Sequence, residues 1–337
     1  MKAIYLEAPM NVKMIEIDKP VRKAGEALIK IISVSLCGSD VGAYRGSNPL
    51  VKYPTILGHE LAGEVVEIDE NESDIKVGDR VIIDPYVYCG TCYACSIGRT
   101  NCCEDLKVLG VQTQGGMAEY ITHPVNLLNK VPANIPLEHI PLAEPLTIAL
   151  HGIHRLKVKA GEHVAIIGAG PIGLLAALVA KAYGAYPILI DLVEERLTLA
   201  KEHGVDHVIN IQKEDAIARI KEITNDRLCE CVLEVSGSNP GIKSAFEYAS
   251  YAGRVALTGW PKNPTELDTG MFTKKELDVV GARTSKGEFE EALDLIQSGK
   301  VDVSIILSKL VKFEEMAEAL VDLSEHPEKY LKIACVL

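Results

Sequence analysis

The sequence feature that most constrains the fold is a glycine-rich loop between an apolar strand and an apolar helix. Residues 163–167 (HVAII) run directly into the loop GAGPIG, and the apolar stretch GLLAALVAKA follows. In this context a GxGxxG loop is typical of a dinucleotide-binding βαβ unit, with the pyrophosphate on the N–H groups that open the helix. Its first glycine allows the tight turn, the second the approach of the phosphates, and the third close helix–strand packing. The predicted cofactor-binding residues of the loop are Gly168, Gly170, Pro171, Ile172 and Gly173.

An acidic residue closes the next predicted strand, PILID, at Asp191, 18 residues after Gly173. A carboxylate there accepts hydrogen bonds from an adenosine ribose and repels a 2′-phosphate, so the pattern favours NAD over NADP. We add Arg196, on the helix that follows, to the expected cofactor-binding residues. The alternative is a strand–turn–helix that binds no ligand.

Hydrophobic patterning divides the chain into a β-rich part and an α/β part. Short strands separated by Gly, Pro and Asp fill roughly the first 145 residues, and strands alternate with helices from about residue 160. This alternation predicts a doubly wound parallel sheet. We expect three segments: residues 1–147, residues 148–287 with the dinucleotide site, and residues 288–337 returning to the first domain.

Four cysteines within 15 residues predict a metal site. Cys89, Cys92, Cys95 and Cys103 have the spacing with which thiolates surround a tetrahedral zinc ion, and four sulfurs leave no open position, so the zinc would be structural. Cys102 is an equally available thiol by spacing, and free buried cysteines are the alternative. Nine cysteines in this pattern indicate a reducing compartment, which we expect to be the cytoplasm.

Three further segments carry residues suited to a catalytic zinc. Cys37 ends an apolar strand, His59 and Glu60 follow a glycine, and Glu144 lies in an apolar stretch. A catalytic zinc needs about three ligands of mixed type and one open position. Alternatively, Cys37 is a core residue, and Glu144 favours a helix N-terminus that has proline at its first position.

The charge balance restricts the partners. With 35 basic and 47 acidic residues the formal net charge is −12, which argues against nucleic acid and against an anionic membrane surface. No apolar run approaches the roughly 18 residues of a membrane span.

Taken together and in order, the motifs resemble the zinc-dependent medium-chain dehydrogenase/reductase family, which includes alcohol, sorbitol and threonine dehydrogenases. The resemblance covers nearly the whole chain. It rests on CGSD at residue 37, GHE at 58, GDRV at 78, the cysteine quartet, GGMAEY at 115, EPL at 144 and the glycine loop.

The resemblance implies a GroES-like catalytic domain and a Rossmann domain, with the active site in the cleft between them. It implies a catalytic zinc on Cys37, His59 and either Glu60 or Glu144, and a structural zinc on the cysteine quartet with Cys103. Zinc would lower the pKa of a bound alcohol, and the resulting zinc-bound alkoxide would give a hydride reversibly to NAD. Ser39 matches the hydroxyl that begins the proton relay of the family. The relatives' outer relay histidine is replaced by Gly42.

Further residues match the loops that border the nicotinamide in the family. They are Val235, Ser236, Gly237, Thr258 and Gly259.

The resemblance also suggests a substrate class. Glu144, in place of the cysteine of alcohol dehydrogenases, is similar to the polyol and threonine branches, and residues 44–54 and 88–104 resemble sugar-acid dehydrogenases of the L-galactonate 5-dehydrogenase type. We therefore expect a small polyhydroxylated substrate, oxidised at a secondary alcohol: a polyol, a sugar acid or a related derivative. Tyr44, Arg45, Asn48 and Arg283 are candidate substrate contacts, although a solvated surface role fits Arg45 and Arg283 equally well.

Two alternatives remain for the function. One is a threonine 3-dehydrogenase-like enzyme, and the other is a non-catalytic regulator that binds NAD and zinc. By analogy with relatives we expect a homo-oligomer, a dimer or a tetramer.

Overall fold

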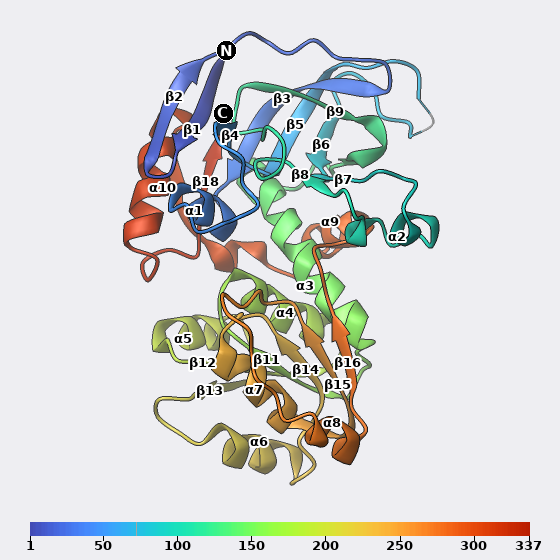
Figure 1. The fold of residues 1–337 in the computed structure, drawn as a ribbon, viewed down its shortest axis with the longest axis vertical. Coiled ribbons are helices and arrows are strands. Elements are labelled where there is room, and N and C mark those ends of the chain that lie inside the picture. Colours follow the sequence, from blue (N-terminus) through green and yellow to red (C-terminus); the bar gives the residue numbers. More distant parts are fainter. Residues whose placement is uncertain (72) are drawn as a thin grey trace. The chain divides into compact units, whose positions relative to one another are not determined.

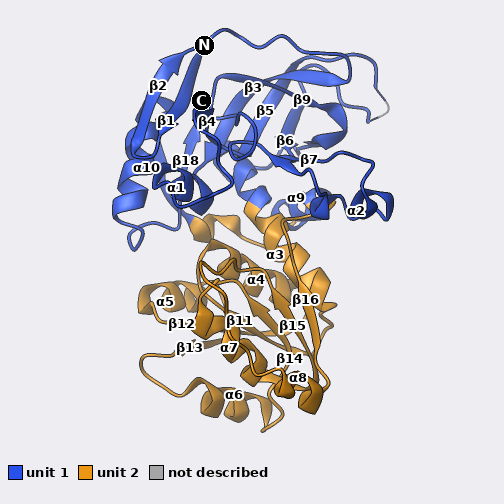
Figure 2. Cartoon of the chain, in the orientation of Figure 1, with its two compact units in different colours: residues 1–144, 289–297, 307–337 blue, residues 145–288, 298–306 orange. Residues whose placement is uncertain are grey.

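The computed structural model describes residues 1–71 and 73–337, which form two compact units (Figure 2). Unit 1 comprises residues 1–144, 289–297 and 307–337, and unit 2 comprises residues 145–288 and 298–306. The sequence places the first boundary after residue 147, and the first segment of unit 1 ends at residue 144. The C-terminal segment differs from the prediction, because residues 298–306 belong to unit 2 rather than to the catalytic unit.

Unit 1 is built mainly from antiparallel strands, as the short alternating segments predict (Figure 1). The strands are β1 (Lys2–Ala8), β2 (Asn11–Glu16), β3 (Glu26–Ser35), β4 (Thr55–Ile56), β5 (Glu60–Glu67), β6 (Arg80–Ile83), β7 (Tyr86–Val87), β8 (Lys107–Val108), β9 (Tyr120–Pro124), β10 (Leu128–Lys130), β17 (Leu307–Val311) and β18 (Lys332–Val336). The helices are α1 (Gly38–Tyr44), α2 (Tyr93–Ser96), α9 (Phe289–Gln297) and α10 (Met316–Glu325), with short 3-10 turns η1 (Thr100–Cys102), η2 (Val125–Leu127), η3 (Leu137–Leu142) and η5 (Phe313–Glu315). Helix α3 (Ala143–Leu156) begins in unit 1 and continues into unit 2.

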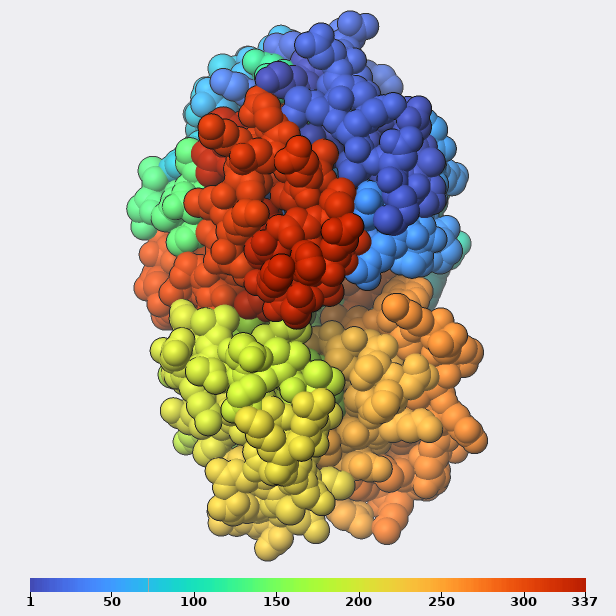
Figure 3. All heavy atoms as spheres, turned by 90° about the vertical axis from the view of Figure 1, so that its left-hand side faces the viewer, coloured from blue at the N-terminus to red at the C-terminus, as the bar shows by residue number. Residues whose placement is uncertain are grey.

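The main sheet of unit 1 joins both ends of the chain. Its order is β10-β6-β5-β3-β18-β17, with β9 also paired to β3, and separate sheets of order β2-β1-β4 and β7-β8 complete the unit. The C-terminal strand β18 is therefore an inner strand, antiparallel to β3, with Ala334 opposite Ser35. Figure 3 shows the red C-terminal segment against the blue N-terminal one on one face of the molecule. This pairing brings residues from the end of the sequence beside the segment that follows β3.

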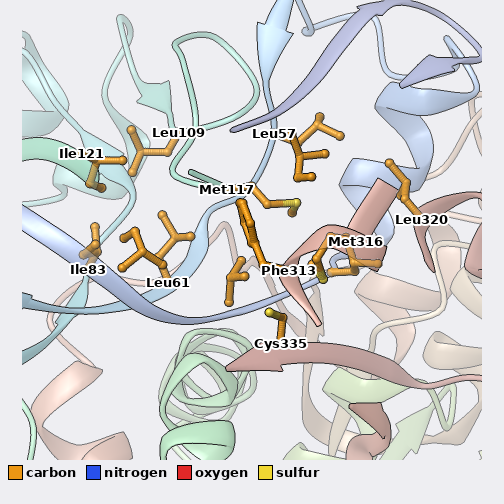
Figure 4. Close-up of a cluster of buried hydrophobic side chains, with 14 of the residues drawn as sticks. Leu57, Leu61, Ile83, Leu109, Met117, Ile121, Phe313, Met316, Leu320 and Cys335 are labelled. Atoms are coloured by element: carbon orange, nitrogen blue, oxygen red, sulfur yellow. The ribbon is translucent and has the colours of Figure 1, made fainter. Parts of the chain in front are cut away.

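The core of unit 1 collects apolar side chains from segments far apart in the sequence (Figure 4). Leu57 and Leu61, on either side of the GHE motif, are fully buried, as is Met117 of the GGMAEY motif. Phe313, Met316 and Leu320 contribute from the C-terminal segment. Burial of such side chains stabilises the fold by about 1.5–3 kcal/mol each, so the segments that carry the polar motifs are held by their apolar neighbours.

Unit 2 contains the doubly wound sheet that the alternation of strands and helices predicts. The strands β11 (His163–Ile167), β12 (Tyr186–Asp191), β13 (His207–Asn210), β14 (Cys229–Glu234), β15 (Ala249–Leu257) and β16 (Asp278–Gly281) are all parallel, in the order β13-β12-β11-β14-β15-β16. The helices are α4 (Pro171–Ala182), α5 (Glu194–Glu202), α6 (Ala216–Thr224), α7 (Asn239–Tyr248) and α8 (Gly270–Lys275), with the 3-10 turn η4 (Val303–Ile306). The strand order reverses between β11 and β14, and ligands of such sheets bind beyond the carboxyl ends of the strands at this point.

Within the described part of the chain, no helix has both the length and the apolar character that crossing a membrane requires.

Candidate zinc and dinucleotide sites

The cysteine lobe brings four sulfur atoms together. The Sγ atoms of Cys89, Cys92, Cys95 and Cys103 all lie within 4.8 Å of one another. The structure selects Cys103, whose side chain is buried, over its neighbour Cys102, which is outside the group. Spacing alone did not distinguish the two. The group has the ligand number and type of a structural zinc site.

Backbone N–H groups point at these sulfurs. The amides of Thr91 and Cys92 each lie 3.4 Å from the sulfur of Cys89, and the Cys89 amide lies 3.3 Å from the sulfur of Cys103. The N–H of Thr91 is the largest cause that lowers the pKa of Cys89 to about 6. Thiolates are the form that binds zinc, so the local backbone favours the metal-binding state.

The second cluster forms where β3 and β5 pair. Cys37 is the N-cap of α1, two residues after the end of β3, and Glu60, the first residue of β5, pairs with Ser35 of β3. This register puts one ligand atom each from Cys37, His59 and Glu60 within 4.8 Å of one another. Two segments far apart in the sequence thus meet where the end of β3 pairs with the start of β5.

His59 is buried among negatively charged or ionisable groups. Its Nδ1 atom has no hydrogen-bond partner among the described residues and lies 3.9 Å from an oxygen of Asp40. Burial by itself lowers the pKa of His59, but Cys37, Asp40 and Glu144 outweigh burial and raise the pKa to about 10. A site that stabilises a positive charge so strongly, with an unpaired buried imidazole nitrogen and a thiol, fits a divalent zinc ion.

Glu60 has a buried positive partner that sequence reasoning did not identify. Lys332, at the start of β18, forms an ion pair with Glu60, and its ammonium also donates to the carbonyl of Leu36 at 3.1 Å. Ser35 donates a hydrogen bond to the other oxygen of Glu60. Burial lowers the pKa of Lys332, yet the charges of Glu60 and Cys37 more than compensate, and its pKa is raised. The only sequence signal was a lysine in an apolar terminal strand, 272 residues from its partner.

Glu144 lies near this cluster but outside the three-residue group. It belongs to the first turn of α3, is 3% exposed, and accepts a hydrogen bond from the hydroxyl of Tyr86, a second partner that the sequence did not reveal. Burial raises the pKa of Glu144, and the charge of His59 opposes this increase. Both carboxylates that the sequence proposed as third ligand are therefore buried, and each has its own hydrogen-bond donor.

The predicted substrate contacts have different surroundings. Tyr44 is buried on α1, and the carboxamide oxygen of Asn48 accepts the amide of Leu50 at 3.1 Å. The guanidinium of Arg45 donates to the hydroxyl of Ser324 at 2.9 Å and to the carbonyl of the same residue, which favours a structural role. Arg283 is exposed and belongs to unit 2.

In unit 2 the glycine loop has the geometry that phosphate binding requires. Gly168 has φ of 110°, and a Cβ atom on Gly173 would lie 1.7 Å from the carbonyl oxygen of Gly168. Around Gly170, by contrast, a Cβ would meet no other atom within 4 Å. The turn and the helix packing therefore depend on glycine, while the middle of the loop is open to a ligand.

Asp191 connects the end of β12 to this loop. One carboxylate oxygen accepts the amide of Ala169 at 2.5 Å, and the other accepts the amides of Leu192 and Val193 at 2.7 and 2.9 Å. Arg196 lies on α5, half-buried.

Polar groups without partners line the other side of the switch point. The hydroxyl oxygens of Thr258, Thr284 and Ser285 are buried and have no hydrogen-bond partner among the described residues. They follow β15 and β16, whose carboxyl ends are adjacent through the pairing of Leu257 with Gly281. Buried hydroxyls without partners are costly, so a polar ligand such as the nicotinamide half of a dinucleotide fits this edge of unit 2.

Two family models match the chain, one in the region of each unit. Residues 23–133 match the alcohol dehydrogenase GroES-like domain, and residues 171–298 match the zinc-binding dehydrogenase family. Together the matches cover most of the chain. It belongs to the zinc-dependent medium-chain dehydrogenases, whose cofactors are zinc and a nicotinamide dinucleotide.

Full-length relatives give the same result. The chain is 58% identical over 336 residues to an uncharacterised zinc-type alcohol dehydrogenase-like protein of Haemophilus influenzae, covering 99% of this chain and 98% of that one. It is 38% identical over 316 residues to an L-threonine 3-dehydrogenase of Pyrococcus furiosus (91% and 90% covered). It is 34% identical over 324 residues to the L-galactonate-5-dehydrogenase of Escherichia coli (94% of each covered).

Solved structures share the whole architecture. An alcohol dehydrogenase of Escherichia coli CFT073 complexed with NADH superimposes with a TM-score of 0.92 at 32% identity, over 100% of this chain and 99% of that one. Galactitol-1-phosphate dehydrogenase of Escherichia coli gives 0.93 at 29% identity, over 100% of each chain. The protein is accordingly an oxidoreductase of the class that acts on CH–OH groups.

Proposed function

We propose that the protein catalyses the zinc- and NAD-dependent oxidation of a secondary alcohol in a polyol, a sugar acid or a related sugar derivative. The observation that carries the proposal is the cluster of Cys37, His59 and Glu60 in unit 1, which supplies sulfur, nitrogen and oxygen donors within 4.8 Å. A regulator without turnover has no need of such a mixed donor set, whereas catalytic zinc sites use one.

In this proposal Cys37 and His59 hold the catalytic zinc, and Glu60 or Glu144 completes the ligand set. When bound, zinc supplies a Lewis acid that makes the substrate alcohol easier to deprotonate near neutral pH. Asp40, with an oxygen 3.9 Å from the Nδ1 atom of His59, adds a buried negative charge beside the imidazole. The Lys332 ammonium neutralises Glu60 and thereby limits the negative charge of the site.

Proton release begins at Ser39. Its hydroxyl lies 3.4 Å from Nε2 of His59, beside the cluster, and is part-buried. The proton of the alcohol passes through this hydroxyl toward solvent. Because residue 42 is glycine rather than the histidine of many relatives, water or another group takes the proton at the outer end.

The dinucleotide would bind at the carboxyl edge of the unit 2 sheet. The open part of the glycine loop at Gly170 would hold its pyrophosphate, and Asp191 would accept the hydroxyls of its adenosine ribose. The same carboxylate would repel a 2′-phosphate, so NAD would be preferred to NADP. When bound, the dinucleotide would supply the hydride acceptor, and the residues around it would hold the reacting carbons close and exclude water.

The substrate class is supported by the names of relatives that act on polyhydroxylated compounds, L-galactonate and galactitol 1-phosphate. Threonine is the second candidate, since a threonine 3-dehydrogenase is 38% identical over most of this chain. A homo-oligomer and a reducing compartment, the cytoplasm, belong to the same proposal. The exposed edge strand β16 supports the homo-oligomer. The nine free cysteines support the reducing compartment.

The experiment is NADH formation by the purified, zinc-replete protein across polyols, aldonic acids, sugar phosphates, L-threonine and simple alcohols. Each active substrate is repeated with NADP and after chelation. We expect chelator-sensitive turnover of one polyhydroxylated compound with NAD. Turnover of threonine alone would move the assignment to the second candidate, and turnover that persists after complete removal of the catalytic zinc would refute the mechanism.

A further inference from the structure

A buried carboxylate at the end of β14 has no part in the mechanism described so far. Glu234 is fully buried, and in the sheet it lies opposite Ile167, the residue that precedes the glycine loop. The next amide, that of Val235, donates to the carbonyl of Ile167 at 3.1 Å. Glu234 therefore lies at the switch point of the sheet, one strand away from the loop that receives the pyrophosphate.

Its carboxylate organises the loop that follows β14. It accepts the amides of Ser236 at 2.9 Å and Gly237 at 3.0 Å, and it also accepts the hydroxyl of Ser236. The hydroxyl of Ser238 lies 2.9 Å from that of Ser236 and caps the N-terminus of α7. Burial raises the pKa of Glu234 above its usual value, and the hydrogen bonds from Ser236 and Gly237 oppose this increase by favouring the ionised form.

The loop that follows β15 packs on the same carboxylate. A Cβ atom on Gly259 would lie 2.6 Å from an oxygen of Glu234 and 2.2 Å from the amide of Gly237. The amides of Thr258 and Gly259 donate to the backbone carbonyl of Glu234 at 2.9 and 3.1 Å. One residue thus supports both loops, and the absence of a side chain at Gly259 permits their close approach.

The position of the cofactor, which rests on the proposed function, puts the nicotinamide near these loops. Asp191 ends β12, on one side of the glycine loop, and takes the adenosine half. The other half must extend in the opposite direction, over β14 and β15. The nicotinamide ring carries a positive charge in NAD⁺ and none in NADH. A fixed anion behind the ring therefore distinguishes the two forms, whereas its repulsion of the pyrophosphate is common to both and cancels in their ratio.

We propose that Glu234 is a positioning residue for the nicotinamide and that its buried negative charge favours binding of the oxidised cofactor over the reduced one. A carboxylate in this place lowers the dissociation constant of NAD⁺ relative to that of NADH. It thereby biases the enzyme toward alcohol oxidation at the level of cofactor binding.

The test is the ratio of the two dissociation constants, measured by calorimetry and by NADH fluorescence on the zinc-loaded protein without substrate. Glu234→Gln keeps the size of the side chain and removes the charge, so the ratio of the NAD⁺ constant to the NADH constant should rise about tenfold. Glu234→Asp shortens the side chain by one methylene group and so moves the charge away from the loops. A smaller rise in the same ratio, about two- to threefold, is expected. Glu230→Gln is the matched control: it lies on the same strand, accepts the amide of His163 at 2.8 Å, and should leave the ratio unchanged.

Folding of the variants is followed separately. Trp260, the only tryptophan, is 79% exposed, and its backbone packs against Gly237, so its emission reports the two loops in the cofactor-free protein. If Glu234→Gln fails to fold, the ratio of dissociation constants measured for Glu234→Asp tests the proposal. Equal weakening of both cofactors, with an unchanged ratio, would overturn the charge effect and leave only a structural role. If the wild-type protein binds neither cofactor, the proposed function itself fails, which is a distinguishable result.

Discussion

The two candidate zinc sites of unit 1 differ in how the chain assembles them. In the cysteine lobe all four donors come from residues 89–103, and backbone amides of the same short segment point at the sulfurs. In the cluster at Cys37, His59 and Glu60 the donors come from separate segments joined by sheet pairing, and the balancing cation, Lys332, comes from the last strand. A site made within one segment needs little besides that segment, whereas a site made between segments depends on the whole fold around it.

The largest expected effect comes from removing one ligand at each site. Cys37→Ser should lower turnover about a thousandfold, because the Lewis acid is lost, and should reduce bound zinc by about one ion per chain. Cys92→Ser should also release about one zinc, but its main effect should be local unfolding of residues 89–103, detected as new proteolytic cleavage there.

Zinc content, turnover and proteolysis of both variants are measured in parallel. If Cys92→Ser abolished turnover as completely as Cys37→Ser while the rest of the chain stayed folded, the distinction between a catalytic and a structural site would be lost.

A smaller effect should follow from removing Lys332, the cation beside the cluster of Cys37, His59 and Glu60. Lys332→Met leaves Glu60 buried without a counter-charge, which should destabilise the zinc-free protein by about 3–5 kcal/mol in urea unfolding. Added zinc should recover part of this loss, because the metal can take over the neutralising role.

The matched control for this variant is Lys309→Met, which removes the exposed pair with Asp322 at 3.5 Å and should leave the unfolding midpoint unchanged. A Lys332→Met protein as stable as the wild type without zinc would contradict the role of Lys332.

The smallest effect is expected from Cys102→Ser, which changes the lobe cysteine that lies outside the sulfur group. Cys103→Ser should release the structural zinc, while Cys102→Ser should retain it, because only Cys103 belongs to the sulfur group. Zinc stoichiometry by mass spectrometry under native conditions separates the two. Equal loss from both variants would mean that the ligand set is interchangeable.

Much of the fold and of the site could be predicted from local sequence. The glycine loop, its preceding strand and the cysteine quartet are contiguous, and their chemistry follows from which residues stand within a few positions of one another. The alternation of strands and helices likewise predicted the parallel sheet of unit 2. The assignment of residues 298–306 to unit 2 could not be anticipated, because a short segment is assigned by what it packs against.

The sequence by itself thus determined the class of protein, the glycine loop and the donor types of both candidate metal sites. Only the tertiary structure gave Glu60 and Glu144 their partners Lys332 and Tyr86 and tied Arg45 to Ser324. The physical reason is that the type of donor atom depends only on which amino acid is present, and the sequence gives this directly. The electrostatic balance of a buried charge depends instead on which distant strand is hydrogen-bonded beside it, and that is set by sheet register and core packing.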